Sequence, residues 1–205
     1  MREYRSMIRA VLFDLDGVVR HFDPEYVAGI ERRHGLAKGA LETFAYAQPL
    51  LSEVTTGRLS RAEWISHIGA GVGRAEAAVE WGNQPSHVDP RVLELVDELR
   101  DLGFTTAILT NGTDTIPEEA RALGLSGRFD RIFNSAEIGY IKPDTRAFEH
   151  VLHALGLDGS EVFFTDDSVS KLVGADALHM RTHEFLGVNV LRSALNNAGI
   201  PISVG

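Results

Sequence analysis

Two aspartates, Asp14 and Asp16, are separated by one residue and lie between an apolar run and Gly17. An aspartate can act as a covalent nucleophile toward phosphorus. A second acid two residues further on could protonate the leaving oxygen and then deprotonate the attacking water. Two such charges ~4 Å apart repel each other by about 4 kcal/mol at an effective dielectric constant near 20. The pair therefore predicts a metal ion, a lysine, or both, at the same place.

Three further groups of polar residues follow apolar runs later in the chain. A threonine hydroxyl, a backbone N–H group and a lysine could hold phosphoryl oxygens, where the charge of the transition state collects. Carboxylate oxygens suit Mg²⁺, which keeps several waters and bridges to substrate phosphate. The residues of these types are Thr110 with Asn111, Lys142, and Asp166 with Asp167.

The apolar runs before these groups have the length and the β-branched content of buried strands. Helical patterns separate them, and this alternation predicts a parallel sheet with right-handed crossovers. The carboxyl ends of parallel strands share one edge, where open α/β sheets hold their ligands. We therefore expect the polar groups to converge there. The predicted strands cover residues 8–13, 104–109, 129–134 and 161–164, and the helices between and after them begin near Pro90 or cover 116–123, 143–155, 168–178 and 187–198.

Residues 23–87 differ from the rest because helical patterns dominate and no convincing strand is found. Asp23-Pro24 is typical of a helix start, and Ser60 with Glu63 forms a capping-box pattern. Further helical stretches are expected around 40–55, 60–70 and 74–81. We expect a helical insertion over 23–87 in an α/β core made of 1–22 and 88–205. Residues 14–22 are expected to form a loop, and the hinges are expected near 19–23 and 84–89.

The composition excludes several classes of protein. The chain has 205 residues, 44% hydrophobic and 24% charged, as in ordinary soluble domains with a real core. Its net charge of −9 argues against a nucleic-acid partner. It has no cysteine, which excludes disulfides and thiolate chemistry. No apolar run approaches the roughly 18 residues of a membrane helix, and the N-terminal segment does not fit a signal peptide. We expect a cytoplasmic protein without a membrane partner.

Taken together, the motifs resemble those of the haloacid dehalogenase-like (HAD) superfamily, whose members are Mg²⁺-dependent hydrolases with an aspartate nucleophile. The resemblance covers approximately residues 8–22 and 88–200 and implies a Rossmann-like parallel sheet core. The insertion resembles the small α-helical cap of the subfamily that includes β-phosphoglucomutase and the phosphatase domain of soluble epoxide hydrolase. The four motifs, in order, are Asp14-Leu15-Asp16-Gly17, Leu109-Thr110-Asn111, Lys142-Pro143 and Asp166-Asp167.

The resemblance implies a role for each matching residue. Asp14 would be the nucleophile and a Mg²⁺ ligand, and Asp16 the general acid/base whose backbone carbonyl also binds the metal. Thr110 would bind the transferring phosphoryl group, with Asn111 beside it. Lys142 would bridge that phosphate and the nucleophile. The implied reaction is hydrolysis of a small phosphorylated metabolite through an aspartyl-phosphate intermediate.

The fourth motif implies Asp167 as a direct metal ligand and Asp166 as a direct or water-mediated one. Many members of the family have asparagine where this chain has Lys171. This lysine is compatible with an anionic substrate, although a solvated position on a helix is the simpler expectation. True haloacid dehalogenases lack an acid at the position of Asp16, so this residue favours phosphate chemistry.

Other interpretations stay open at this stage. Each motif alone has a structural explanation, because aspartates often form turns or helix caps; their order and placement favour a functional role. A phosphomutase of the same fold, a dehalogenase and a non-catalytic binding module are the alternative functions. The substrate and the oligomeric state are open. His21, Glu53 and Arg58 are candidate substrate contacts.

Overall fold

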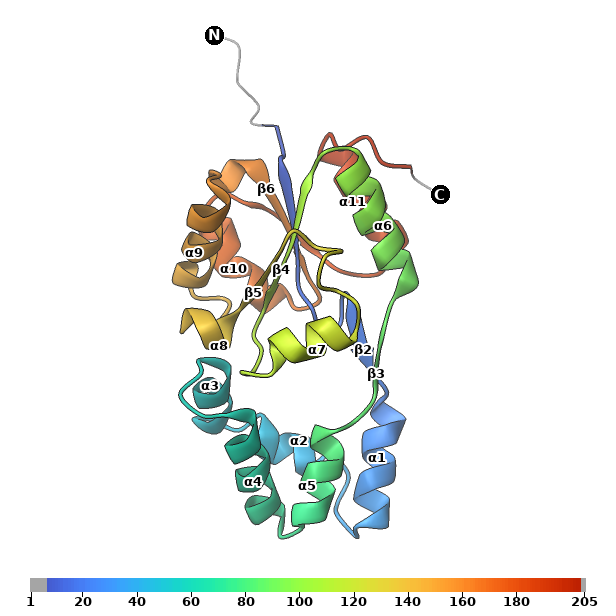
Figure 1. Cartoon of the computed structure of the whole chain (residues 1–205), viewed down its shortest axis with the longest axis vertical. Coiled ribbons are helices and arrows are strands. Elements are labelled where there is room, and N and C mark those ends of the chain that lie inside the picture. Colours follow the sequence, from blue (N-terminus) through green and yellow to red (C-terminus); the bar gives the residue numbers. More distant parts are fainter. Residues whose placement is uncertain (1–6, 204–205) are drawn as a thin grey trace.

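The computed structural model describes residues 7–203 and shows an α/β core with a helical insertion (Figure 1). Residues 1–6 and 204–205, which belong to the predicted core segments 1–22 and 88–205, lie outside the described residues. The strands of the central sheet are β1 (Ala10–Phe13), β4 (Thr105–Thr110), β5 (Arg131–Asn134), β6 (Val162–Asp166) and β7 (Arg181–Glu184). They are parallel, in the order β5-β4-β1-β6-β7.

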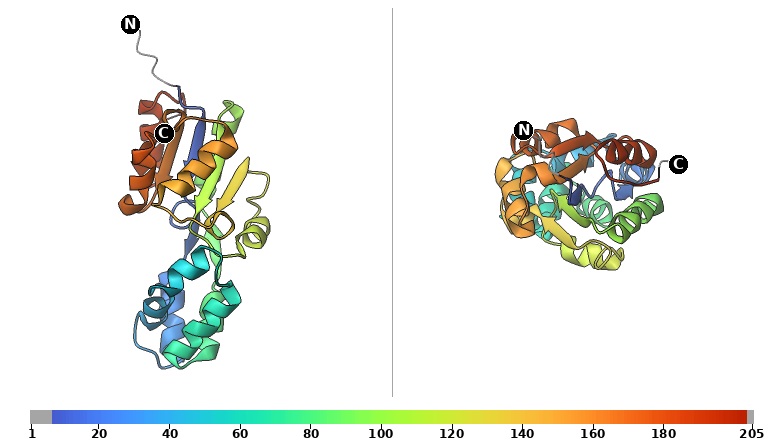
Figure 2. Two further views of the ribbon diagram at one scale, coloured as in Figure 1. Left: turned by 90° about the vertical axis from the view of Figure 1, so that its left-hand side faces the viewer. Right: turned by 90° about the horizontal axis from the view of Figure 1, so that it is seen from above.

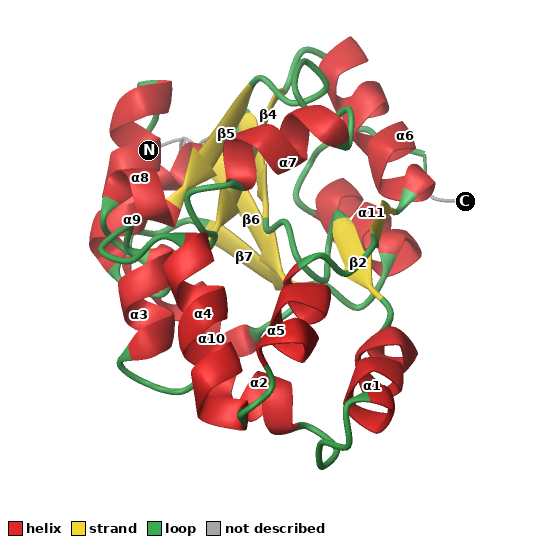
Figure 3. Cartoon of the chain, turned by 60° about the horizontal axis from the view of Figure 1, so that its bottom comes forward, coloured by secondary structure: helices red, strands yellow, loops and turns green. Residues whose placement is uncertain are grey.

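The central strand β1 is buried on both faces, as expected for a parallel sheet covered by helices. Because side chains alternate along a strand, Val11 and Phe13 pack into one apolar cluster with α6, α7 and α11, and Ala10 and Leu12 into another with α9 and α10. Figure 3 shows the helices on both sides of the sheet. The core helices are α6 (Pro90–Asp101), α7 (Ile116–Ala122), α8 (Ser135–Ile138), α9 (Thr145–Leu155), α10 (Val169–Ala177) and α11 (Val188–Asn197), with a 3₁₀ turn at Gly159–Glu161.

The helical insertion has its own apolar cluster, in which the rings of Trp64 and Trp81 meet edge to face with centroids 5.2 Å apart. The predicted capping box at Ser60 and Glu63 is confirmed. Figure 2 shows the insertion beyond one end of the sheet. Its helices are α1 (Pro24–Arg33), α2 (Ala40–Ala45), α3 (Leu50–Thr55), α4 (Arg61–Val72) and α5 (Ala75–Gly82).

Two short strands join the insertion to the core and pair antiparallel. They are β2 (Arg20–Phe22) and β3 (Ser86–Val88), with His21 opposite His87. The sequence predicted a loop over 14–22 and no strand in 23–87. The first prediction is wrong at residues 20–22, which form β2, and the second at residues 86 and 87, which belong to β3. A three-residue strand carries almost no periodic signal, and its partner lies far along the chain.

The main elements agree with the sequence, and the α/β fold with a helical insertion after the first strand is confirmed. The four predicted sheet strands lie within two residues of the observed ones. Strand β7 and helix α8 were not predicted, because one is polar and the other is a single turn. The stretch 40–55 is two helices with Pro49 between them. No helix within residues 7–203 is both long and apolar enough to cross a bilayer.

The insertion also contacts the core where the turn after α3 meets α8. The Ser135 hydroxyl donates to the Thr55 carbonyl over 2.5 Å. Gly57, in this turn, has a positive φ of +72°, and a methyl group there would overlap the carbonyl oxygen of Ala136. A glycine is therefore required here both for its backbone conformation and for the close approach of the two segments.

This contact gives the first prediction. Gly57→Ala should lower the free energy of unfolding by more than the roughly 1–2 kcal/mol that an L-residue loses in a left-handed conformation, because the added methyl also pushes the turn away from Ala136. Urea unfolding followed by far-UV circular dichroism measures the difference.

Gly73 is the matched control, since it has a similar φ of +69° and nothing within 4 Å of an added Cβ. Gly73→Ala should show the conformational cost alone. Equal losses in the two variants would show that the approach to Ala136 contributes nothing.

Candidate active site

The polar groups predicted to converge do meet at the carboxyl edge of the sheet. Asp14 follows β1 directly, Thr110 ends β4, and Asp166 ends β6. Strands β4 and β6 both pair with β1. Parallel pairing therefore brings residues from both ends of the chain to one place, as the strand order requires.

Three carboxylates form a tight cluster. Asp14, Asp166 and Asp167 each offer one oxygen, and these oxygens lie within 4.8 Å of one another. Asp166 is 0% exposed. Its Oδ1 accepts a hydrogen bond from the backbone N–H of Ser168 over 2.9 Å. Burial raises the pKa of Asp167, and the neighbouring Asp166 carboxylate adds to this shift.

Lys142 is the counter-charge inside this cluster. The side chain is 1% exposed, and its ammonium lies 2.7 Å from Asp14 Oδ1 and 2.6 Å from Asp166 Oδ2. Burial raises the pKa of Asp14 to about 7, while Lys142 acts in the opposite direction and Asp166 adds to the rise. Lys142 therefore partly offsets the cost of placing these carboxylates together.

The two oxygens of Asp14 have different surroundings. Oδ1 accepts from the Lys142 ammonium and from the backbone N–H of Leu15, both over 2.7 Å. Oδ2 accepts no hydrogen bond from any described residue. One oxygen is thus held in place and the other is free to react or to bind a cation.

The cluster fits a divalent cation. Three carboxylates and one ammonium leave two uncompensated negative charges when the acids are ionised. All the donors are carboxylate oxygens, the ligand type that Mg²⁺ and Ca²⁺ prefer. The cluster could therefore hold a metal ion through Asp14, Asp166 and Asp167.

The loop that carries Lys142 is fixed by two side chains. The Asn111 amide donates to the Lys142 carbonyl over 2.9 Å and accepts from the Lys142 N–H over 2.8 Å. The Lys171 ammonium donates to the same carbonyl over 3.3 Å. Lys171, expected to be a solvated helix residue, is instead half-buried and supports this loop. The Thr110 hydroxyl, by contrast, donates to no described residue and remains available to a ligand.

Gly17 allows the loop after β1 to approach the cluster. Its φ is +90°, and a methyl group at this position would overlap the Asp167 carboxylate. The first and the fourth motif therefore approach each other closely at Gly17. Any larger residue would displace Asp167.

Asp16 does not belong to the carboxylate cluster and is paired with Arg20. The guanidinium donates to both carboxylate oxygens, over 2.5 Å from Nε and 2.9 Å from a terminal nitrogen. Arg20 also donates to Glu119 on α7 over 2.5 Å. Burial alone would lower the pKa of Arg20, but the hydrogen bonds to Asp16 and Glu119 raise it. The side chain of Asp16 is thus not in the group of possible metal ligands, whereas the other three acids are.

Arg20 and Glu119 were missed in the sequence, although both contribute to the site. Asp16 and Arg20 are four residues apart, which is a weak signal for an ion pair outside a helix. Glu119 lies on α7 and gives no sequence signal for a contact with Arg20. Burial raises the pKa of Glu119, but hydrogen bonds from Thr115 and Arg20 outweigh it, and the net shift is downward.

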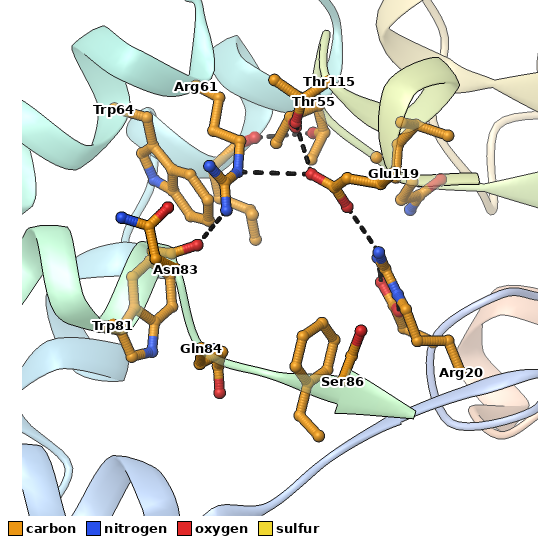
Figure 4. Close-up of a pocket in the computed structure, with 18 of the residues that line it drawn as sticks. Arg20, Thr55, Arg61, Trp64, Trp81, Asn83, Gln84, Ser86, Thr115 and Glu119 are labelled. Carbon is orange, nitrogen blue, oxygen red and sulfur yellow. Dashed lines mark hydrogen bonds and ion pairs between the residues drawn. The ribbon is translucent and has the colours of Figure 1, made fainter. Parts of the chain in front are cut away.

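A cavity of about 520 Å³ lies between the insertion and the core and reaches the site through Asp16 and Asn111. Figure 4 shows its walls, with Trp64 and Trp81 from the insertion facing Arg20 and Glu119 from the core. Arg61 bridges the two sides, since it contacts Glu119 at 3.6 Å and donates to the Gly82 carbonyl. The predicted contacts His21, Glu53 and Arg58 are not among the residues that line this cavity.

The buried ammonium gives the second prediction. Lys142→Met should lower the free energy of unfolding by about 3 kcal/mol or more in the presence of EDTA, because it leaves Asp14 and Asp166 buried without their counter-charge. Urea denaturation measures the loss.

Lys171→Met removes a half-buried ammonium on α10 that donates to the Lys142 carbonyl, and it serves as the control, with an expected loss of about 1 kcal/mol or less. A Lys142→Met protein as stable as wild type would mean that the ion pairs contribute nothing to the fold.

The sequence of this chain is similar to those of known hydrolases. The model of haloacid dehalogenase-like hydrolases matches residues 8–178. The chain is 25% identical over 203 residues to mouse bifunctional epoxide hydrolase 2, covering 85% of this chain and 36% of that protein. It is 28% identical over 204 residues to a phosphatase of Mycobacterium tuberculosis, covering 86% of each. The chain spans 36% to 52% of the length of three of its curated relatives.

Solved structures share the fold. A HAD family enzyme of Bacteroides thetaiotaomicron, in complex with magnesium and inorganic phosphate, has a TM-score of 0.72 at 22% identity, covering 86% of this chain and 93% of that one. The family model covers most of the chain and includes all four motifs. The chain therefore belongs to the haloacid dehalogenase-like hydrolases.

Proposed function

We propose that this chain is a phosphatase that hydrolyses a small phosphorylated metabolite through a covalent phosphate ester of Asp14. The observation that carries the proposal is the Asp14 carboxylate, held by Lys142 in a cluster of acids with one oxygen free. Two observations support it further. A relative that matches along 86% of its own length is a phosphatase, and a protein with the same fold binds magnesium and phosphate.

The metal in this proposal is Mg²⁺, held by Asp14, Asp166 and Asp167 together with the backbone carbonyl of Asp16. When bound, the ion would neutralise charge on the phosphoryl oxygens. The acid cluster suits it because the donors are hard oxygens with a net negative charge.

In the first step, the free oxygen of Asp14 attacks phosphorus and the bond to the leaving oxygen breaks. Asp16 gives its proton to that oxygen, so an alcohol leaves and an aspartyl phosphate remains. Both carboxylate oxygens of Asp16 accept hydrogen bonds from Arg20 in this structure. Asp16 must therefore separate from Arg20 before it can contact the leaving oxygen.

In the second step, Asp16 takes a proton from a water molecule that attacks phosphorus and frees Asp14. The Lys142 ammonium and the Thr110 hydroxyl would hold the phosphoryl oxygens in both steps. Asn111 would act through Lys142, because its amide is fully used on the backbone of that residue. Inorganic phosphate is the second product.

The helical insertion would act as a cap that excludes bulk water while the intermediate exists. We propose residues 23–87 as this cap domain and 1–22 with 88–205 as the core domain. The paired strands β2 and β3 are then the two connections about which the cap would move.

The third prediction tests the nucleophile and the acid/base separately. With phenyl phosphate and Mg²⁺, Asp14→Asn should lower kcat at least about 10³-fold, and Asp16→Asn about 10²–10⁴-fold. Release of inorganic phosphate is the measured quantity, and EDTA should abolish it in the wild-type protein.

Asp97→Asn changes a half-exposed acid that is paired with Arg128 on the surface and is the matched control. Full activity in Asp14→Asn would remove the covalent mechanism. Phosphate that is transferred to a second sugar phosphate and not released to water would identify a phosphomutase instead.

A further inference from the structure

Arg20 is a buried cation that two carboxylates share. Its side chain is 5% exposed. Two of its guanidinium nitrogens donate to Asp16, and the third donates to Glu119 Oε2 over 2.5 Å. A buried cation that has lost its anion costs free energy. Arg20 therefore needs at least one of these two partners at every stage of the reaction proposed above.

Asp16 is the partner that the proposed reaction removes. Its side chain is 44% exposed and lines the cavity between the insertion and the core. While both of its oxygens accept from Arg20, neither can donate a proton to the leaving oxygen. When Asp16 turns toward that oxygen, the guanidinium therefore loses two of its three hydrogen bonds to carboxylates.

Glu119 is held beside Arg20 independently of Asp16. It lies on α7 of the core, and its side chain is 28% exposed. Its Oε1 accepts from the Thr115 hydroxyl over 2.6 Å and lies 3.6 Å from Arg61 of the insertion. Figure 4 shows Glu119 between Arg61 and Arg20. Glu119 can therefore stay paired with Arg20 after Asp16 has moved.

No other acid is placed to do this. Among the described residues, Asp16 and Glu119 are the only carboxylates in an ion pair with Arg20. Burial alone would raise the pKa of Glu119, but the hydrogen bonds from Thr115 and Arg20 lower it, so the carboxylate is charged at neutral pH. Without the charge of Glu119, Asp16 would be the one anion left to Arg20.

We propose that Glu119 is a positioning residue for Asp16 and that it acts through Arg20. When Asp16 turns to the leaving oxygen, the guanidinium stays paired with Glu119, so no buried charge is left without a partner. This inference rests on the phosphatase function proposed above, in which Asp16 is the general acid. An uncharged residue at position 119 would retain Asp16 at Arg20 and slow the step in which Asp16 gives up its proton.

The fourth prediction compares two esters of similar size that differ in their need for an acid. Benzyl phosphate releases an alkoxide that must be protonated as it leaves, whereas 4-nitrophenyl phosphate releases a stable phenolate. We define the acid ratio as kcat/KM for benzyl phosphate divided by kcat/KM for 4-nitrophenyl phosphate, both with Mg²⁺. Because kcat/KM covers the steps up to the transfer of phosphate to Asp14, this ratio reports the acid step and not the later attack of water.

Glu119→Gln should lower the acid ratio at least about tenfold, because Asp16 must then break charge-assisted hydrogen bonds that leave Arg20 without an anion. The value of kcat/KM for 4-nitrophenyl phosphate should stay within about threefold of wild type. A general loosening of the site would lower kcat/KM for both esters alike and leave the acid ratio unchanged.

Glu98→Gln is the matched control. Glu98 has a side chain that is 29% exposed and accepts from Arg192 over 2.5 Å, but it lies on α6 and does not line the cavity. The acid ratio of this variant should stay within about twofold of wild type.

A double variant shows whether the effect passes through Arg20. In Arg20→Met combined with Glu119→Gln, no guanidinium is left to retain Asp16, so the acid ratio should return to within about threefold of wild type. This variant removes both charges together and keeps the test valid if thermal melting shows that Glu119→Gln alone fails to fold. A ratio as low in the double variant as expected for Glu119→Gln would overturn the role of Arg20.

The outcomes separate this inference from the proposed phosphatase function. If wild-type protein hydrolyses both esters and Asp16→Asn lowers the acid ratio but Glu119→Gln does not, this inference alone is overturned. If Asp16→Asn leaves the acid ratio unchanged, the proposed acid step fails and the inference with it. If neither ester is hydrolysed with Mg²⁺, the proposed function itself fails.

Discussion

The site depends on one interaction, the buried contact of the Lys142 ammonium with Asp14 and Asp166. Burying carboxylates this close together costs free energy. The Lys142 ammonium offsets part of this cost because it contacts both of them. The order of strands places β1 next to β6, so that the acids meet. Lys142 reaches them from the segment between β5 and α9, where Asn111 and Lys171 hold its backbone. The remaining negative charge is what makes the cluster suitable for a divalent ion.

Much of this arrangement could be predicted from the sequence, because it follows from short local patterns. Each apolar run that ends in an acid or a threonine, such as Ile8 to Phe13 before Asp14, became a strand of the sheet or most of one. Parallel strands share their carboxyl edge, so the order of elements was enough to gather Asp14, Thr110 and Asp166. Elements without a periodic signal could not be predicted in this way: β2 and β3 have three residues each, and β7 is a polar edge strand.

The surroundings of Asp16 could not be predicted, for a different physical reason. Arg20 contacts Asp16 and Glu119 together, and the second of these contacts joins residues 99 positions apart. Such pairs depend on how α7 packs, which no local pattern encodes. The same holds for Trp81 and Gln84: their types are ordinary in a helical insertion, and only the packed structure shows that Trp81 Nε1 and Gln84 Oε1 are buried without partners. The motifs that form the acid cluster are thus visible in the sequence, whereas the contacts around them depend on how the helices pack.

The central claim is that the acid cluster has room and charge for one divalent ion beside Lys142. Calorimetric titration of the metal-free protein with Mg²⁺ tests it most directly, with Asp167→Asn as the comparison, since Asp167 makes no hydrogen bond that its loss would break elsewhere among the described residues. We predict one ion per wild-type chain and binding weakened at least about tenfold in the variant. No binding to wild-type protein, or equal binding to both proteins, would contradict the account.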